Sequence, residues 1–516
     1  MGDATIVISD GGSGISVPQQ SVQLVIGPAA GGPTFQILAT QNPNTLQSQY
    51  VGGMLPEAAA LACRNGGTVL AIRVPVNATG TATTVQGPYA PAAGKIDGTT
   101  TTAGTSLATI TLTLDGSIGA YDEYYVIFKI TKGGSLGTTG VQFQLSLDHG
   151  RTYGPVLSLG TASSWVIPNT GITLVFGGTT FVAGEVYRFA TRGPTWTDGA
   201  VQSALTVAQM SQYAAAGGWG STHIVGCPAT SPTDGVAGSD ATTIGGYLGT
   251  LETGKVFTGA FISARDTILP STYGGAGESE STWVASLAAD YAAVSQKRIS
   301  CGAGHYNMPS AFPTQQCGTP KYRRPVAWCA AAQEVNVPTQ RNIGRVSDGA
   351  PPQIVVDPTT DPIDGFVYHD ERNIAGLSVA RFMTMKTYPR QPGLFIDEPN
   401  MMAPPGSDFF IWPFRAVMDV ACSIVYAAGV LLINSDIRVN PNGTIYENEA
   451  QQIEATIRRK LIAGMTGMTS GDPTVVVSRS QNVRATASVP ITVTIQGRTY
   501  IISETITIGF QNSQAA

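Results

Sequence analysis

The sequence predicts an α/β multidomain protein: a mixed sheet with flanking helices, an inserted all-β sandwich-like domain, and a C-terminal α+β domain. Three observations predict this class. Strand-length apolar runs alternate with helix-length periodic segments over residues 21–84 and 196–345. Short strand patterns separated by turn residues fill residues 85–195. Two long helical patterns and then period-2 runs occupy roughly the last hundred residues.

The α/β pattern runs strand, strand, helix, strand over "VQLVIG", "FQILA", Leu55 to Arg64 and "TVLAIRVP". It resumes after residue 195 with three predicted helices, 201–216, 242–251 and 280–296. Each is followed by a predicted strand, "THIVGCP", "VFTGAFISA" and "RISCGAG". Because such alternation produces parallel strands with helices on the faces, we assign residues 21–84 and 196–345 to one discontinuous domain with a largely parallel sheet.

Residues 85–195 differ in character from both flanks. Their β-rich segments are "LATITLTL", "EYYVIFKIT", "VQFQLSL", "ITLVF" and "EVYRFAT", separated by Gly, Pro, Asn or Asp. The pattern predicts an inserted β-sandwich. Residues 302–409 are dense in Pro and polar turns, and we interpret them as a connector that leads into a C-terminal domain spanning residues 346–499.

A long helix is predicted from Pro413 to Leu432, with Pro in its first turn and Gly429 as the one breaker. Its apolar residues surround most of the circumference, which indicates burial on several sides. A membrane span is the alternative. Arg415 and Asp419 leave an apolar run shorter than the roughly 20 residues that cross a bilayer, so we expect a buried core helix and no stable membrane insertion.

A second helix is predicted to end at Gly464, with a capping box formed either by Thr444 and Glu447 or by Asn448 and Gln451. Its apolar face consists of Ala450, Ile453, Ile457 and Leu461. Arg458, Arg459 and Lys460 lie together on the same helix.

Two period-2 strands close the chain, residues 489–495 and 500–510, joined by a turn at Gln496-Gly497. The second strand is longer than the first. At the other end, the apolar run around Ile6 and Ile8 has no obvious local partner, unless it is an ordinary first strand of the first domain. Strands with unpaired backbone groups invite pairing with another chain.

Composition excludes several classes. Charged residues make up only 12%, which suggests a surface intended for contact with copies of the same chain. A net charge of -5 without a basic tract argues against a nucleic-acid partner. The start Met1-Gly2-Asp3-Ala4 lacks the features of a signal peptide, so we expect cytoplasmic synthesis. The six cysteines include no C-x-x-C pair and are expected to be buried thiols.

No motif supports catalysis, a cofactor or a metal. His369-Asp370-Glu371 comes nearest to an acid/base or metal cluster, but adjacent residues in a strand or loop point in different directions. The glycine-rich "GPAAGGP" lacks the Lys-Ser/Thr of a phosphate loop and is expected to form a turn. We therefore expect no catalytic, cofactor-binding or metal-binding residues.

The order of these elements resembles the C-terminal domain of the contractile-tail sheath proteins of bacteriophages. The segments that carry the resemblance are "LLINSDIRV", "NGTIYENEAQQIEATIRRKL" and "VPITVTIQGRTYIISETITIGF", together with "YVGGMLPEAAALACRNGGTVLAIRVP" nearer the start. The resemblance implies a structural subunit of the virion tail that polymerises helically around the tail tube and contracts to drive the tube through the host envelope. It also implies that the inserted domain lies outermost and the C-terminal domain innermost.

Further implications concern the partners. The resemblance implies hexameric rings stacked in a helix, a tail tube protein, and baseplate and tail terminator proteins. Strands exchanged between subunits would complete the C-terminal domain, from an N-terminal arm (residues 1–20) and a C-terminal linking strand and tail (residues 500–516). We assign this exchange to Ile6, Val7, Ile8, Tyr500, Ile502, Ile506 and Ile508. No nucleotide is implied, because the energy would be stored in the extended packing.

Arg458, Arg459 and Lys460 become candidates for the surface that faces the tube. The alternative is that these cations only complement the helix dipole, with Arg458 pairing with Glu454. Two other functions also remain open. One is the sheath of a related injection machine, of bacteriocin or secretion type; the other is an α/β enzyme with a β insertion, which predicts a cleft with convergent polar groups.

Overall fold

The structure is a computed structural model, and it describes residues 19–90, 102–229, 235–351, 366 and 368–500. The chain divides into two compact units, residues 1–431 and 432–516. The sequence interpretation began the C-terminal domain at residue 346, whereas the described residues 366–431 belong to the first unit. The roles assigned to the domains stay predictions.

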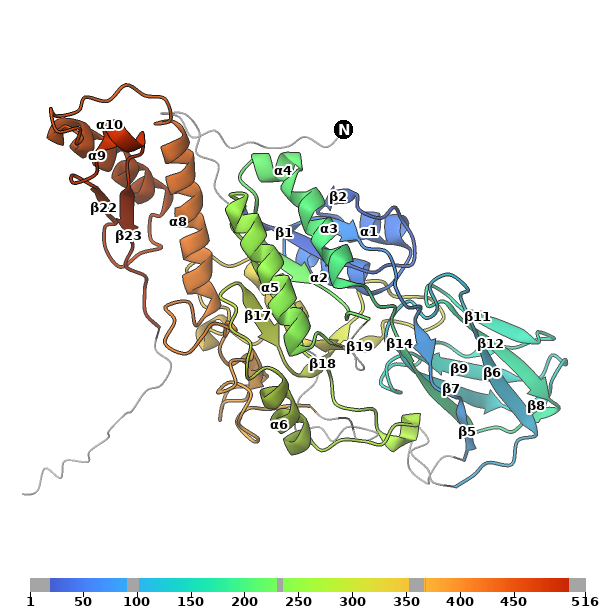
Figure 1. The fold of residues 1–516 in the computed structure, drawn as a ribbon. Helices are drawn as coiled ribbons and strands as arrows, with labels where there is room; N and C mark the ends of the chain where they lie inside the picture. Colours follow the sequence, from blue (N-terminus) through green and yellow to red (C-terminus); the bar gives the residue numbers. More distant parts are fainter. Residues whose placement is uncertain (1–18, 91–101, 230–234, 352–365, 367, 501–516) are drawn as a thin grey trace, which may run out of the picture. The chain divides into compact units, whose positions relative to one another are not determined.

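The first unit is built on a six-stranded mixed sheet (Figure 1). Its order is β17 (Ile299–Gly302), β16 (Gly259–Ser263), β15 (Trp219–Ile224), β1 (Gln19–Gly27), β3 (Thr68–Arg73) and β2 (Ile37–Thr40). All neighbours run parallel except β2, which is antiparallel to β3. The largely parallel α/β sheet expected from the sequence is therefore present.

Helices cover both faces of this sheet, and alternate strand residues face each layer. Val25, Val69 and Ala71 belong to one core with α2 (Met54–Arg64) and α7 (Val326–Glu334). Leu24 and Leu70 belong to the opposite core, whose helices are α3 (Asp198–Gln209), α5 (Gly238–Thr253) and α6 (Glu280–Asp290). Figure 1 shows α3 and α5 lying across the sheet on the viewer's side. Burial on both faces explains the uninterrupted apolar runs in β1 ("LVI"), β3 ("VLAI") and β16 ("AFI").

Some helix boundaries differ from the prediction. The helix expected over 201–216 is interrupted, because Ser211 ends α3 and caps the short α4 (Gln212–Ala215) by accepting from Ala214 N–H. The helix expected over 280–296 ends at Asp290. An additional helix, α1 (Pro43–Tyr50), starts at Asn42, whose side chain accepts from Asn44 N–H. Asn followed by Pro is a helix start signal that could have been found in the sequence.

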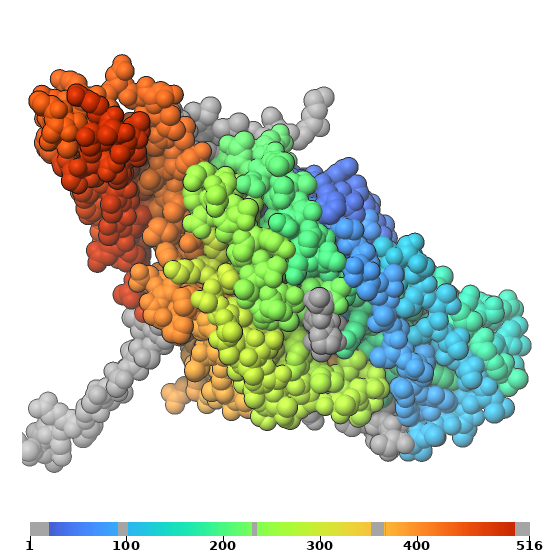
Figure 2. Space-filling view, viewed as in Figure 1, coloured from blue at the N-terminus to red at the C-terminus, as the bar shows by residue number. Residues whose placement is uncertain are grey.

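The β-rich segment forms two main sheets over its own core (Figure 1). One has the order β10-β9-β7-β14-β4, with β5 also pairing with β14, and the other has the order β11-β12-β6; β8 and β13 form a small pair. The strands are β4 (Thr81–Ala82), β5 (Gln86–Tyr89), β6 (Ala108–Leu114), β7 (Tyr125–Lys132), β8 (Gly134–Ser135), β9 (Gln142–Ser146), β10 (Leu157–Ser158), β11 (Ser164–Ile167), β12 (Ile172–Gly178), β13 (Thr180–Phe181) and β14 (Val186–Arg192). In Figure 2 these cyan and teal residues form one block that adjoins the α/β layer.

The interpretation of residues 302–409 as a connector differs from what the structure shows. This stretch supplies α7, the hairpin β18 (His305–Pro309) and β19 (Lys321–Pro325), and the pair β20 (Met385–Lys386) and β21 (Phe395–Ile396). Its irregular backbone also covers the edge of the sheet: Met402 N–H donates to Ile299 O, and Met383 N–H donates to Cys301 O. The buried residues of this irregular stretch occur in groups of two or three, such as Leu394–Ile396 and Met401–Ala403, which are too short to give a periodic pattern in the sequence.

The predicted long helix is α8 (Trp412–Val430), with Pro413 in its first turn. By length and composition α8 is the one helix in the described ranges that could cross a membrane, yet 56% of it is buried inside the protein. Its first turns hold buried charges, because Arg415 and Arg298 both pair with Asp419. Burial of its first two-thirds agrees with the expected core helix.

In the second unit, α9 (Glu447–Gly464) packs on a hairpin of β22 (Thr474–Val477) and β23 (Ile491–Thr494) (Figure 1). The predicted apolar face of α9 is the buried one. Neither predicted capping box forms: Tyr446 occupies the N-cap without a side-chain hydrogen bond, since Thr444 binds Asn442 and Glu447 binds Arg479. A short helix, α10 (Val483–Thr486), links the two strands.

Candidate functional site: the assembly surface of residues 432–500

The first strand of the predicted closing hairpin is present as β23, and it pairs with β22, a strand that the sequence interpretation missed. Of the expected second strand, residues 500–510, only Tyr500 lies within the described residues. The β-branched run "TVVV" directly after Asp472-Pro473 was the available signal. Of the residues assigned to strand exchange, Tyr500 lies outside any strand. Ile6, Val7, Ile8, Ile502, Ile506 and Ile508 lie outside the described residues, so their role stays a prediction.

The face of the hairpin under α9 is covered unevenly. Val475 and Val477 of β22 are buried, and this strand contacts α9. Directly opposite them in register are Val493 and Ile491 of β23, which share that face but are only half-buried. An apolar strip beside β23 is therefore left partly open.

The two outer edges of the hairpin also differ. Val477 N–H points away from β23 and donates to Glu454 Oε1 at 2.7 Å. Arg479 binds both Glu454 and Glu447, so the edge of β22 is blocked at this point by a helix side chain. Within residues 432–500 the sheet contains no third strand, which leaves the edge of β23 as the open one.

Hydrogen-bond alternation identifies the donors on that open edge. Ser478 N–H donates to Pro490 O, and the next pair along, Val477 and Ile491, directs its backbone groups outward. In an antiparallel ladder such pairs alternate, so Val493 also directs its N–H outward while Thr492 bonds within the hairpin. Ile491 and Val493 therefore offer backbone donors beside an apolar strip.

The three candidate tube-facing cations lie on α9 in different environments. Arg458 pairs with Asp472 at 2.9 Å, and both side chains are more than half exposed. The expected Arg458–Glu454 pair does not form, because Glu454 is held by Arg479. Arg459 is exposed and donates to Ala455 O in its own helix, and Lys460 is half-exposed.

The charges of this unit do not balance. Glu447, Glu449, Glu454 and Asp472 are each paired with an arginine. In the stretch 432–500, by contrast, four cations make no ion pair, against one such acid, Asp436. The four are Arg459, Lys460, Arg484 and Arg498. An excess of unpaired positive charge favours an acidic partner surface.

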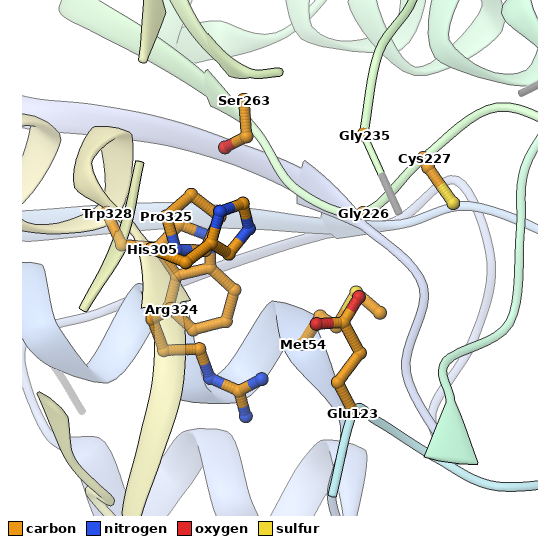
Figure 3. A pocket seen from close by; sticks show the side chains of 10 residues that line it. All are labelled: Met54, Glu123, Gly226, Cys227, Gly235, Ser263, His305, Arg324, Pro325 and Trp328. Carbon is orange, nitrogen blue, oxygen red and sulfur yellow. The ribbon is translucent and has the colours of Figure 1, made fainter. Parts of the chain in front are cut away.

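The enzyme alternative requires a cleft, and a small cavity lies in the first unit at the carboxyl ends of β15 and β16 (Figure 3). Its volume is about 20 Å³, and Ser263, Cys227, His305, Glu123 and Arg324 are among its lining residues. This space suits one water molecule. It is far smaller than a typical small-molecule site of roughly 300–1,000 Å³.

Ser263, His305 and Asp266 lie in this region without forming a nucleophile and base. His305 Nδ1 is 3.5 Å from Asp266 Oδ1, beyond hydrogen-bond distance, and Arg323 occupies the Asp266 carboxylate at 2.5 and 2.8 Å. Ser263 Oγ has no hydrogen-bond partner in the described structure. Burial lowers the pKa of His305 to about 4, which makes it a poor base.

We expected His369, Asp370 and Glu371 to point in different directions, but the structure brings His369 and Glu371 together. His369 lies between two carboxylates, with Nδ1 2.8 Å from Glu280 and Nε2 2.9 Å from Glu371. Burial disfavours the imidazolium, but these hydrogen bonds outweigh burial and raise the pKa of His369. Asp370 turns instead to Thr387. No group of three or more His, Cys, Asp or Glu is placed to hold a metal ion in the described ranges.

No family model and no curated protein matches the chain. Its fold is similar to that of three solved sheath structures. The sheath tail protein of Desulfitobacterium hafniense is 9% identical (96% of this chain, 100% of that chain, TM-score 0.43). The sheath tail protein of Listeria innocua is 10% identical (92% and 94%, TM-score 0.41). The contracted helical sheath of the anti-feeding prophage is 11% identical (99% and 98%, TM-score 0.45).

Proposed function

We propose that the chain is the structural subunit of a contractile tail sheath. In this function it polymerises helically around a tail tube and contracts to drive the tube through the host envelope. The observation that carries the proposal is the two-stranded hairpin of residues 432–500. The edge of β23 and the apolar strip beside it could bind an added strand. The low charge of the chain, 12%, suits a surface made for contact with its own copies.

Strands from neighbouring subunits are the proposed occupants of the β23 edge. The terminal runs around Ile6, Val7 and Ile8, and around Tyr500, Ile502, Ile506 and Ile508, have the alternating apolar pattern that strand addition requires. Main-chain hydrogen bonds to Ile491 and Val493 would supply affinity, and the half-buried strip would supply specificity. Each subunit would thereby be tied to others in a helical stack of hexameric rings.

The tail tube is the proposed partner of the unpaired cations. Arg459 and Lys460, together with Arg484 and Arg498, give residues 432–500 an excess of positive charge that an acidic tube surface would complement. Arg458 is a weaker candidate, because Asp472 already neutralises it. The remaining proposed partners are the baseplate and the tail terminator, and the proposed location is the virion tail.

An edge-specific substitution tests the proposal. Val493→Pro removes the outward N–H and leaves the ladder bonds made by Thr492 in place, because an edge strand tolerates proline there. We expect folded protein that no longer forms long polymers in negative-stain images. Val493→Ala, the matched control, loses a similar apolar side chain but keeps the N–H, and we expect it to polymerise.

Truncations identify the occupant of the edge. Removal of residues 1–9, or of residues 500–516, is expected to leave folded subunits that fail to form long polymers. Unchanged polymerisation of both truncated proteins and of Val493→Pro would overturn the strand-exchange proposal.

A further inference from the structure

The ring of His369 contacts carboxylates from two separate parts of the first unit. Its Nδ1 lies 2.8 Å from Glu280 Oε1, and its Nε2 lies 2.9 Å from Glu371 Oε2. Glu280 is the first residue of α6, whereas Glu371 follows His369 by two positions. The His369 side chain is only 1% exposed. The imidazole therefore links the start of α6 to the segment 368–371.

These two contacts require two donors on the ring. An ionised carboxylate only accepts hydrogen bonds, and a neutral imidazole carries a single N–H. Only the imidazolium form of His369 can therefore donate to Glu280 and to Glu371 at the same time. When the ring loses a proton, one of its nitrogens presents a lone pair to a carboxylate oxygen at 2.8 or 2.9 Å, which is repulsive. One of the two contacts must then open.

The surroundings of the two carboxylates determine which contact opens. The side chain of Glu371 is 5% exposed, and its Oε1 accepts from the backbone N–H groups of Gly376 at 2.8 Å and Ser378 at 3.1 Å. The side chain of Glu280 is 21% exposed, and its carboxylate makes no other hydrogen bond among the described residues. Glu280 can therefore turn to water, whereas Glu371 would leave two backbone donors without their acceptor.

The other groups around the ring leave this choice unchanged. From α6, Trp283 packs against the ring of His369, with centroids 5.6 Å apart. From β18, Tyr306 donates to the backbone oxygen of His369 at 2.6 Å, and the Asp370 carboxylate is bound to Thr387. Burial disfavours the imidazolium, but the hydrogen bonds and charges of the two glutamates outweigh burial and raise the pKa of His369. The protonation of the ring therefore depends on these two carboxylates.

We propose that His369 is a pH-dependent clamp on α6: the imidazolium joins Glu280 to Glu371, and the neutral ring stays with Glu371 and releases Glu280. The first turn of α6 then loses its link to the segment 368–371, while the remainder of the helix stays packed. Because the pKa of His369 is raised in the folded protein, the link is complete below about pH 6.5 and is lost as the pH rises through the folded pKa. The clamp is a property of the folded subunit and does not depend on the sheath function.

Hydrogen exchange of the full-length protein at pH 6 and pH 9, corrected for the intrinsic pH dependence of amide exchange, tests the clamp. The reporters are Thr282 and Trp283, whose N–H groups donate to Ser279 in the first turn of α6. Their protection is expected to be about tenfold lower at pH 9, because the helix start has lost a hydrogen bond to a charged group. Protection of residues 287–290, at the other end of α6, is expected to be the same at both pH values.

Two variants separate the clamp from a merely structural role of position 280. In Glu280→Gln the new amide can accept from the imidazolium and can also donate to the neutral ring, so protection of the first turn is expected to be independent of pH. Glu278→Gln, the matched control, alters a carboxylate bound to Arg265 and is expected to keep the pH dependence of the unmodified protein. Constant protection in the unmodified protein, an equal loss at residues 287–290, or the same pH dependence in Glu280→Gln would overturn the clamp.

Discussion

Arg324 and Asp122 form a buried bidentate ion pair, with nitrogen to oxygen distances of 2.9 and 2.6 Å. Arg324 lies on β19, and Asp122 lies within the inserted segment just before β7. The guanidinium also stacks on Tyr322 and Trp328, at 4.9 and 4.8 Å from their ring centroids. This pair joins the β-rich segment to the α/β layer.

Asp122→Ala is expected to lower the free energy of unfolding by about 3 to 5 kcal/mol, because it leaves Arg324 buried without its carboxylate. Chemical denaturation measures the loss. Asp472→Ala, which breaks the exposed pair with Arg458, serves as control and is expected to cost about 1 kcal/mol or less. Equal effects of the two substitutions would contradict the structural role of the Arg324–Asp122 pair.

Removal of residues 85–195 is a related test. The sequence predicts an inserted β-sandwich over these residues, but the core of this segment includes Cys317 and Tyr322 from outside it. We expect the remainder of the chain to expose these residues and Arg324, and therefore to be less soluble than the full chain. A well-folded remainder with unchanged stability would show that the segment is autonomous.

The His369 contacts predict pH-dependent stability. The pKa of His369 is raised in the folded state, so its stabilising contribution is complete below about pH 6.5 and is lost as the pH rises through the folded pKa. Because of this group, the free energy of unfolding measured in urea is expected to be greater at pH 6 than at pH 9. His369→Gln is expected to abolish that difference, and an unchanged difference would assign it to other groups.

Removal of the negative charge of Asp198 is expected to stabilise the protein at a pH above the pKa of this carboxyl. Burial, with a smaller effect of Asp240, raises the pKa of Asp198 to about 6. Stability is therefore lost as the pH rises from about 4 through 6. Asp198→Asn is expected to stabilise the protein at pH 8 by on the order of 1 kcal/mol, because the carboxyl is only partly buried, and to have little effect at pH 4. Thermal melts at the two pH values measure these effects. Asp436→Asn, which removes a carboxylate at an exposed position, is the control.

The proposed tube contact predicts an assembly defect without a folding defect. Arg459→Glu is expected to block assembly on tubes while leaving stability and tube-free polymers intact, since Arg459 makes no ion pair in residues 432–500. Gln452→Glu, seven residues earlier on the same face of α9, adds one negative charge without removing the arginine and is expected to weaken docking less than Arg459→Glu does. Docking of the unmodified protein is expected to weaken as salt rises. Normal assembly of tails that carry Arg459→Glu would show that Arg459 does not contact the tube.

The sequence predicted elements best where periodicity is strong. The apolar face of α9 and the alternation of strands and helices around β15, β16 and β17 both follow from local patterns. The cap of α9 could not be predicted, because Glu447 is drawn away by Arg479, a residue 32 positions along the chain.

The candidate site was only partly foreseeable for the same reason. Arg458, Arg459 and Lys460 were visible as a cluster, but which of them carries an unpaired charge depends on Asp472, which folding brings to Arg458. His369 and Glu371 were visible, whereas Glu280 joins them from a helix 89 positions earlier in the chain. Local sequence gives the residue types at such sites, and tertiary packing selects their partners.

Electron microscopy of the purified full-length protein tests the central claim most directly. The account predicts that the chain, at raised concentration and without any other component, forms rings or helical tubes of repeating subunits. Under the same conditions Val493→Pro is expected to remain as dispersed subunits. A monomer or small closed oligomer at every concentration, identical for the unmodified protein and for Val493→Pro, would contradict the sheath function.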